Sequence, residues 1–466
     1  MMMRANVIHT DLNPCGGAER LAVATMQALS QMGFEIDFTV ARAPDIRCIE
    51  KAFGEDAARV LRQVRVVRMG RLPLLQKQRR AAADMATMTV TARTAAAENE
   101  KGHSSSCSQV RQQQQQQQQQ YYDLFVNTHG DVLPYYLPQF TRANAITYCH
   151  YPVAAEYVRD RLLPYIEHME NLGLVDPAGD REKVWGEILR HYLLMLENSL
   201  VLTNSNFSRQ AIKALCGVTH EPIVVAPPVN VEEFQTPPQP VASAAAAAAA
   251  MAGGARLPQR SPRDDVVLVV SRLNPSKKLE NAIELASLLK ERGICAGGVV
   301  IAGNLGRGDV CGQEYRRRLE DMIRARGLAG YVQIKTNASL AELKALMHSS
   351  KIYFHTMPAE PFGISVAEAM SAGLIPVVPD IGGQAEFVPR KYQFRSLEEA
   401  TAIIAGSLGA DDKERAVISG SVRRFSASEY IRSLQGLVRE LVAAPSPKQI
   451  VAQQQQRHGS AAAAAL

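Results

Sequence analysis

Residues 352–378 read Ile-Tyr-Phe-His-Thr-Met-Pro-Ala-Glu-Pro-Phe-Gly-Ile-Ser-Val-Ala-Glu-Ala-Met-Ser-Ala-Gly-Leu-Ile-Pro-Val-Val. The runs Ile352–His355 and Ile375–Val378 are short and apolar, which is typical of strands buried in a parallel sheet. A turn that contains Gly363 leads from the first run into a short helix, and Gly373 ends that helix because glycine readily adopts the left-handed conformation. The stretch therefore predicts a β-α-β unit.

The same stretch carries two carboxylates, Glu360 before the turn and Glu368 inside the helix. Backbone N–H groups at a helix N-terminus bind phosphate, and carboxylates on either side of them are able to bind hydroxyl groups. Phosphate together with hydroxyls is the chemistry of a nucleotide sugar. An alternative stays open, because Ser365-Val-Ala-Glu368 also fits a capping box in which Glu368 only begins the helix.

The composition indicates an ordinary globular protein of 466 residues, enough for two domains, with 46% hydrophobic and 21% charged residues. No apolar run of about 18 residues predicts a membrane span, and no signal-peptide pattern is present, so we expect a cytoplasmic protein. The seven cysteines are scattered without a Cys-x-x-Cys pair, which argues for reduced thiols and against a zinc knuckle. The net charge of +6 suits an anionic substrate or a lipid surface.

Low-complexity composition divides the chain into parts. Residues 81–120, which end in the run Gln112–Gln120, residues 237–263, which include Ala244–Ala250, and the tail 444–466 lack the apolar pattern of a core. We therefore predict a first domain over 1–236 with a disordered insert at 81–120, a linker over 237–263, a second domain with a terminal helix over 264–443, and a disordered tail. A helical poly-alanine segment stays possible for the linker.

Between these segments short apolar runs alternate with helices such as Glu19–Met32 and Leu279–Arg292, each followed by a glycine. The predicted fold class is α/β, with two doubly wound Rossmann-like domains that face each other across a cleft and bind ligands at the carboxyl ends of their strands. The predicted strands are Ala5–Thr10, Ile36–Ala41, Leu124–Thr128, Ala145–Cys149, Leu200–Thr203, Ile223–Ala226, Val266–Ser271, Gly298–Ala302, Val332–Lys335, Ile352–His355 and Ile375–Val378.

Candidate site residues follow directly after several of these strands. Gly16 and Gly17 let a ligand approach the backbone where a helix begins. Arg272 and Lys277 share one loop and suit the clamping of a diphosphate, although the same residues also fit a solvated basic loop. His150 is placed to exchange hydrogen bonds with a reacting sugar.

Spacing alone does not select His150, because His9, His129 and His355 lie at similar strand ends. No Gly-x-Gly-x-x-Gly follows any predicted strand, which speaks against a dinucleotide-dependent dehydrogenase. No nucleic-acid motif is present either, so we expect no nucleic-acid partner.

Seven features occur together and in order: Gly16-Gly-Ala-Glu-Arg20, the strand-end His150, Ser271-Arg-Leu-x-x-x-Lys277, Ala302-Gly303, Glu360-x7-Glu368, Glu368-Ala-Met-Ser-Ala-Gly373 and Gly382-Gly-x-x-Glu386. As a set they resemble the retaining glycosyltransferases of family four, which have the GT-B architecture. Asn127-Thr-His-Gly-Asp131 and Tyr148-Cys-His-Tyr-Pro152 carry a finer resemblance, to the α-1,2-mannosyltransferases that extend the dolichol-linked oligosaccharide from GDP-mannose. Eukaryotic members usually begin with a membrane anchor that this sequence lacks, so a soluble or archaeal-type relative also fits.

The resemblance implies that the second domain holds a nucleotide sugar. Arg272 and Lys277 would neutralise its diphosphate, the leaving group, in place of a metal, so we expect no metal and no other cofactor. Glu368 would bind the ribose hydroxyls, and Glu360 would hold the transferred sugar together with backbone N–H groups. Those N–H groups belong to Phe362, Gly363 and Ile364.

For the first domain the resemblance implies that His150 faces the sugar and that Gly16 and Gly17 lie beside the acceptor or a phosphate. The acceptor would be a glycan or a lipid-linked glycan. The basic segment Arg59–Arg80 suits weak peripheral contact with an anionic membrane, and it also fits a solvated face. Two other hypotheses stay open: a GT-B-shaped sugar-nucleotide epimerase, and a non-catalytic nucleotide-sugar-binding or scaffold protein.

Overall fold

The computed structural model describes residues 2–69, 122–130, 144–152, 181–237, 263–306 and 309–443. The chain divides into two compact units, of which the first comprises residues 1–203, 209–224 and 431–466 and the second residues 204–208 and 225–430. The predicted insert at 81–120 and the tail 444–466 lie outside the described residues, as does the predicted linker except at its two ends.

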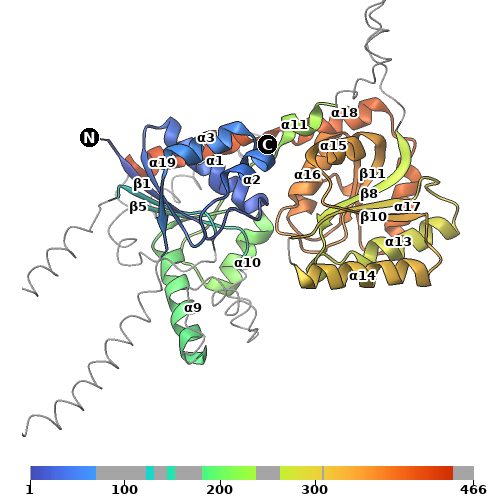
Figure 1. The fold of residues 1–466 in the computed structure, drawn as a ribbon, viewed down its shortest axis with the longest axis horizontal. Helices are drawn as coiled ribbons and strands as arrows, with labels where there is room; N and C mark the ends of the chain where they lie inside the picture. The colour runs from blue at the N-terminus through green and yellow to red at the C-terminus, as the bar shows by residue number, and fades with distance from the viewer. Residues whose placement is uncertain are drawn as a thin grey trace, which may run out of the picture. The chain divides into compact units, whose positions relative to one another are not determined.

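The first unit is built on a parallel sheet (Figure 1). Its seven described strands lie in the order β3-β2-β1-β4-β5-β6-β7, so the order reverses between β1 and β4. A sheet of this kind binds ligands at that switch point, beyond the carboxyl ends of the strands. The strands are β1 (Arg4–Ile8), β2 (Glu35–Val40), β3 (Arg65–Arg68), β4 (Leu124–Asn127), β5 (Asn144–Cys149), β6 (Leu200–Thr203) and β7 (Ile223–Val224).

The second unit repeats this plan. Its six strands, counted over the described residues, are parallel and lie in the order β10-β9-β8-β11-β12-β13, with the switch point between β8 and β11. The strands are β8 (Asp264–Arg272), β9 (Val299–Asn304), β10 (Val332–Thr336), β11 (Ser350–Phe354), β12 (Ile375–Pro379) and β13 (Gln393–Phe394).

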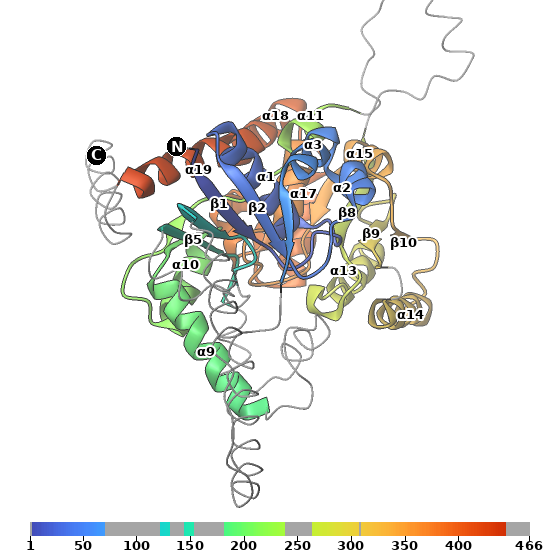
Figure 2. The same ribbon diagram turned by 60° about the vertical axis from the view of Figure 1, so that its left-hand side comes forward.

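Helices cover the two sheets, as Figures 1 and 2 show for each unit. The helices beside the first sheet are α1 (Gly17–Gln31), α2 (Ile46–Phe53), α3 (Glu55–Gln63), α9 (Arg181–Glu197), α10 (Asn206–Cys216) and α19 (Ala427–Ala443). The second unit has α11 (Val231–Gln235), α13 (Glu280–Glu291), α14 (Val310–Ala325), α15 (Leu340–Ser349), α16 (Ile364–Ser371), α17 (Leu397–Ser407) and α18 (Asp412–Ser421). Its short 3-10 turns are η1 (Pro275–Lys277), η2 (Gly383–Glu386), η3 (Arg390–Tyr392) and η4 (Arg423–Phe425).

The predicted α/β fold with two Rossmann-like units is confirmed, and each predicted strand lies on an observed one. Gly33, Gly293 and Gly373 have φ of +83°, +65° and +84° and follow the ends of α1, α13 and α16, as predicted. Two strands were missed. β3 reads Arg-Val-Val-Arg and lies at a sheet edge, and β13 has only two residues, so neither has the apolar run that marks a buried strand.

The two units exchange segments that the predicted domain boundaries did not foresee. Residues 225–236 pack into the second unit, where the Val229 N–H donates to Phe425 O at 2.8 Å and Ser371 Oγ donates to Val231 O at 2.6 Å. The terminal helix α19 returns to the first unit, where the Gln435 amide donates to Ala28 O of α1 at 3.2 Å (Figures 1 and 2). Local composition does not predict the placement of either segment, because each is held by residues that are distant in the sequence.

The described part of the basic segment Arg59–Arg80 spans the end of α3 and the strand β3. Three of its arginines pair with carboxylates: Arg59 with Asp56 at 3.1 Å, Arg62 with Glu50 at 2.8 Å and Arg65 with Asp37. These pairs partly neutralise the charge that the predicted membrane contact needs. Of the helices in the described ranges, none is long and apolar enough to cross a membrane.

Candidate functional site

The switch point of the second unit brings together the loops after β8 and β11. Lys277 ends η1 in the first loop, and its backbone carbonyl accepts a 2.6 Å hydrogen bond from Thr356 Oγ1 in the second. The Thr356 carbonyl in turn accepts from Asn281 Nδ2 of α13 at 2.9 Å. These bonds fix the two loops against each other, so side chains far apart in the sequence meet at one place.

Lys277 and Glu360 form an ion pair there, with 2.7 Å between Nζ and Oε2 and side chains only 20% and 17% exposed. The His355 Nε2 lies 3.6 Å from the same oxygen. Burial alone would raise the pKa of Glu360, but the contact with His355 and the positive charge of Lys277 outweigh it and hold that pKa at about 2. Glu360 is therefore a carboxylate throughout the neutral range.

Arg272 is the last residue of β8 and is exposed to solvent. Within the described ranges it forms no ion pair, so its guanidinium is not held by a carboxylate of the protein. The sequence placed Arg272 and Lys277 in one clamp, and the structure leaves Arg272 open while Lys277 is already paired.

The capping-box alternative for Glu368 is wrong. Helix α16 begins at Ile364 with Gly363 as its N-cap, so Ser365 lies inside the helix and its hydroxyl bonds the Tyr353 hydroxyl at 2.8 Å. Glu368 lies one turn further on and is only 7% exposed. Both Glu360 and Glu368 raise the pKa of the buried Tyr353, after burial itself, which shows that the two carboxylates lie within electrostatic reach of one phenol.

The turn before α16 is stabilised by side-chain packing and by backbone contacts. The Phe362 ring is 5% exposed and packs against Phe387 and, edge to face, against Phe425, with centroids 5.2 Å apart in both pairs. Its side chain is therefore not available to a ligand. Gly363 has φ of +94°, which turns the chain into the helix at Ile364. The predicted ligand contacts of these three N–H groups stay a prediction.

Gly382 and Gly383 lie directly against this turn. Gly382 pairs with Glu360 in an isolated parallel bridge, and the Gly383 N–H donates to Glu360 O at 2.7 Å. A Cβ on Gly383 would lie 2.0 Å from Pro361 O.

We expect Gly383→Ala to lower the free energy of unfolding by about 1–3 kcal/mol or more, because an inserted methyl must displace backbone. Urea unfolding of the second unit would measure the loss. Gly406→Ala is the matched control: this position in α17 has nothing within 4 Å, so the variant should be unchanged or slightly stabilised. Equal behaviour of the two variants would contradict the packing described.

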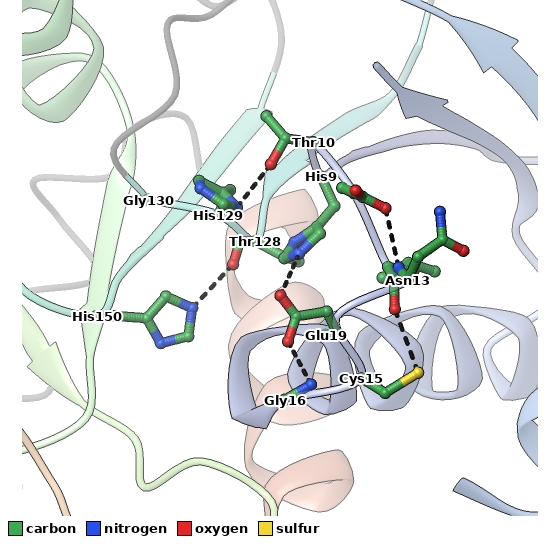
Figure 3. Close-up of polar contacts among 12 residues, drawn as sticks. His9, Thr10, Asn13, Cys15, Gly16, Glu19, Thr128, His129, Gly130 and His150 are labelled. Atoms are coloured by element: carbon green, nitrogen blue, oxygen red, sulfur yellow. Dashed lines mark hydrogen bonds and ion pairs between the residues drawn. The ribbon is translucent and has the colours of Figure 1, made fainter. Parts of the chain in front are cut away.

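In the first unit the loops after β1 and β4 meet in the same way (Figure 3). The His9 Nδ1 lies 3.0 Å from Thr128 Oγ1, which itself donates to Ile8 O, so the histidine donates to the threonine. Thr10 Oγ1 lies 3.1 Å from His129 Nδ1. Both contacts join residues 119 positions apart, and they form a polar cluster at the switch point.

Glu19 occupies the place that the sequence suggested for a ligand beside Gly16. Gly16 is the N-cap of α1 and its N–H donates to Glu19 Oε2 at 2.6 Å, while Glu19 Oε1 lies 3.7 Å from His9 Nε2 (Figure 3). A ligand on the Gly16 N–H would have to displace this carboxylate. The role predicted for Gly17, the first residue of α1, stays a prediction.

The stability of this cluster should depend on acid. Burial raises the pKa of Glu19, but the contacts with His9 and the Gly16 N–H outweigh it, so the folded-state pKa lies below the usual 4.5. The stabilisation that Glu19 contributes is therefore present above pH about 4.5 and is lost as the pH falls through the folded-state pKa.

We expect Glu19→Gln to lower the free energy of unfolding by about 1–3 kcal/mol at pH 7 and by less at pH 4. Urea titrations test this, with the exposed Glu55→Gln as control; equal losses at both pH values would contradict it.

His150 follows β5, and its Nε2 donates to Thr128 O at 3.0 Å (Figure 3). Burial, together with the nearby His9, lowers the pKa of His150 to about 4, although the hydrogen bond to Thr128 acts in the opposite direction. The ring is neutral at pH 7, and because the proton lies on Nε2, Nδ1 is an acceptor. The structure thus connects His150 to the His9–Thr128 cluster and favours acceptance of a hydroxyl proton over donation of one.

Several residues at or near the two switch points are not singled out by the sequence. His355 is only one of several strand-end histidines there, and Glu19 is only part of a motif. Glu386 accepts hydrogen bonds from the N–H groups of Asn206 and Phe207 at 3.0 and 2.7 Å, and Ser205 Oγ donates to Pro361 O at 2.6 Å. All these residues except Glu19 belong to the second unit. They are far apart in the sequence, so no local pattern connects them.

Residues 258–400 match the protein family described as "Glycosyl transferases group 1". This group 1 segment contains Arg272, Lys277, Glu360 and Glu368, the charged residues that the sequence predicts for the site of the second unit.

Two kinds of curated relative resemble the chain. The mouse GDP-Man:Man(3)GlcNAc(2)-PP-Dol alpha-1,2-mannosyltransferase is 28% identical over 245 residues, which cover 50% of this chain and 46% of that one. The GDP-mannose:cellobiosyl-diphosphopolyprenol alpha-mannosyltransferase of Xanthomonas oryzae is 40% identical over 75 residues, 16% of this chain and 20% of that one. The chain thus spans about half or less of the length of these relatives.

Solved structures confirm the fold. A glycosyltransferase from Rickettsia africae superposes with a TM-score of 0.60 at 15% identity, covering 94% of this chain and 98% of that one. HepE from Anabaena, solved with UDP and glucose, superposes with a TM-score of 0.57 at 17% identity and covers 95% and 100% of the two chains. The likeness of fold to these structures therefore extends beyond the group 1 segment to nearly the whole chain.

Proposed function

We propose that the protein is a retaining hexosyltransferase that moves mannose from GDP-mannose to a glycan or lipid-linked acceptor. One observation carries the proposal: a half-buried, ionised Glu360 paired with Lys277 at the second switch point, where the exposed Arg272 ends β8. The two cations suit the diphosphate of a nucleotide sugar, and the carboxylate suits the hydroxyl groups of its sugar.

The choice of donor and acceptor is supported by the relatives. Both kinds carry names that contain GDP-mannose and an acceptor linked through diphosphate to dolichol or polyprenol, although they differ in the sugar that the acceptor carries. Peripheral contact with an anionic membrane through Arg59–Arg80 would bring such an acceptor close. That contact stays a prediction, since at least three of the arginines are paired within the protein.

We propose further that no metal is needed. Arg272 and Lys277 would neutralise the leaving diphosphate, and Glu368 would bind the ribose hydroxyls. In the first unit, His150 would accept a hydrogen bond from a hydroxyl through Nδ1. Retention of configuration would follow from attack by the acceptor on the face that the diphosphate leaves, with the diphosphate taking the proton.

The test is transfer by the full chain in the presence of EDTA. GDP-mannose, UDP-glucose and ADP-glucose are offered with a short polyprenyl-diphosphate oligosaccharide, and products are identified by mass spectrometry and by the anomeric proton signal. We expect an α-mannoside from GDP-mannose at an unchanged rate with EDTA. Activity that is lost with EDTA and restored by manganese would refute the metal-free clamp.

The other hypotheses predict different outcomes. An altered sugar nucleotide without transfer would identify an epimerase, and tight binding of GDP-mannose without turnover would identify a binding or scaffold protein.

A further inference from the structure

We propose that His355 is a positioning residue for Glu360. In this role His355 is a second partner, which holds the Glu360 carboxylate when Lys277 moves to the donor diphosphate. The second half of this statement rests on the proposed function. The first half, that His355 is the reserve partner of Glu360, depends only on the geometry of the second unit.

The imidazole of His355 is fixed beside Glu360. Its backbone N–H donates to Val377 O of β12 at 2.9 Å, and its ring stacks on Tyr353 with centroids 6.4 Å apart and planes inclined by 21°. The residue is 6% exposed. Its Nε2 is buried and makes no hydrogen bond with any described residue.

That Nε2 points at an oxygen that is already in use. Glu360 Oε2 binds Lys277 Nζ at 2.7 Å and lies 3.6 Å from His355 Nε2, too far for a hydrogen bond. The lysine ammonium and an imidazole nitrogen thus face one oxygen, and the shorter contact belongs to the lysine. The histidine is in contact range but not bonded.

Removing the lysine changes this balance. A buried carboxylate without a partner is strongly unfavourable, whereas a histidine that closes to about 2.8 Å makes a charge-assisted hydrogen bond. Among the described residues, the titratable groups that act on or beside Glu360 are Lys277 at the end of η1, His355 directly after β11 and Tyr353 within β11. Tyr353 OH is bonded to Ser365 Oγ, so the imidazole is the group placed to replace the ammonium.

The exchange would serve the reaction as follows. When the donor arrives, its diphosphate attracts Lys277 Nζ away from Glu360. His355 then keeps Glu360 ionised and oriented, so the carboxylate meets the transferred sugar in a fixed position.

The first test needs no ligand. In a double-variant cycle, Lys277→Met and His355→Phe are made singly and together, and stability of the second unit is followed by hydrogen exchange of β11 and β12. We expect the double variant to shift the unfolding equilibrium by about 10-fold more than the product of the single shifts, because either partner alone still serves Glu360. The excess should vanish in a Glu360→Gln background.

A matched control replaces a histidine elsewhere in the unit. His348 on α15 bonds Phe234 O through Nε2 at 2.9 Å, so Lys277→Met combined with His348→Gln should show multiplicative, uncoupled effects.

The second test uses the geometry of amide side chains. His355→Phe should lower kcat by about 10- to 100-fold, the scale of one hydrogen bond to a charged group, and leave the Kd for GDP within about 2-fold. His355→Gln places an N–H near the original Nε2 and should recover most of the rate, whereas His355→Asn reaches only the Nδ1 position and should not.

The outcomes separate the two proposals. Uncoupled stability in the Lys277–His355 cycle, or equal rescue by Asn and Gln, overturns the role of His355. Coupled stability in a protein that neither binds nor uses any nucleotide sugar supports His355 as the reserve partner and refutes the proposed function.

Discussion

Glu360→Gln is expected to lower the rate of sugar transfer by about 100- to 1,000-fold, the scale of removing one preorganised electrostatic contact. The reason is geometric: Glu360 is held by Lys277 at 2.7 Å and faces His355, so its charge is fixed in position before the donor arrives. Glutamine keeps the shape and removes the charge. Because the contact is expected to strengthen in the transition state, kcat should fall far more than the affinity for GDP-mannose.

The measurement is steady-state kinetics together with calorimetric binding of the donor. The exposed Glu398→Gln in α17 is the control and should keep wild-type kinetics. Glu360→Gln with normal kcat in a folded protein would remove the main support for the proposed site.

The same substitution should change the acid stability. The pKa of Glu360 is about 2, below the usual 4.5, so its contribution is present above pH about 4.5 and is lost as the pH falls toward 2. The glutamine variant should therefore differ from the wild-type protein less at pH 2 than at pH 7.

Lys277→Ala is expected to lower the transfer rate by about 100- to 1,000-fold and also to weaken the binding of GDP. Unlike Glu360, the lysine would contact the diphosphate in the ground state as well as in the transition state, so both parameters should fall. Arg272→Met should weaken GDP binding too, and more strongly at low ionic strength, because an exposed cation is screened by salt.

The control for both is Lys278→Asn. Lys278 is exposed, immediately follows Lys277 and has φ of +52°, a conformation that asparagine tolerates. The variant loses the same charge from the same loop and should bind GDP nearly as the wild-type protein does. A loss equal to that of Lys277→Ala would show that loop charge in general, rather than the lysine at the switch point, attracts the nucleotide.

The sequence alone determined the two parallel sheets and supplied most of the candidate residues of the second-unit site. Buried parallel strands are continuous apolar runs, and glycines at φ near +80° end α1 and α16, so these signals are local. The family-like spacing of Glu360 and Glu368 and the cations after β8 are local too. These features can therefore be predicted without the structure.

Tertiary structure alone decided how those residues are paired. Lys277 meets Glu360 across 83 positions, His9 meets Thr128 across 119, and the Gly16 N–H is taken by Glu19, so the state of each group depends on a neighbour that spacing does not reveal. The same holds for the segments that cross between units, because α19 finds its partners in α1. Sheet order, which places the ends of β8 and β11 side by side, is what turns separate motifs into a site.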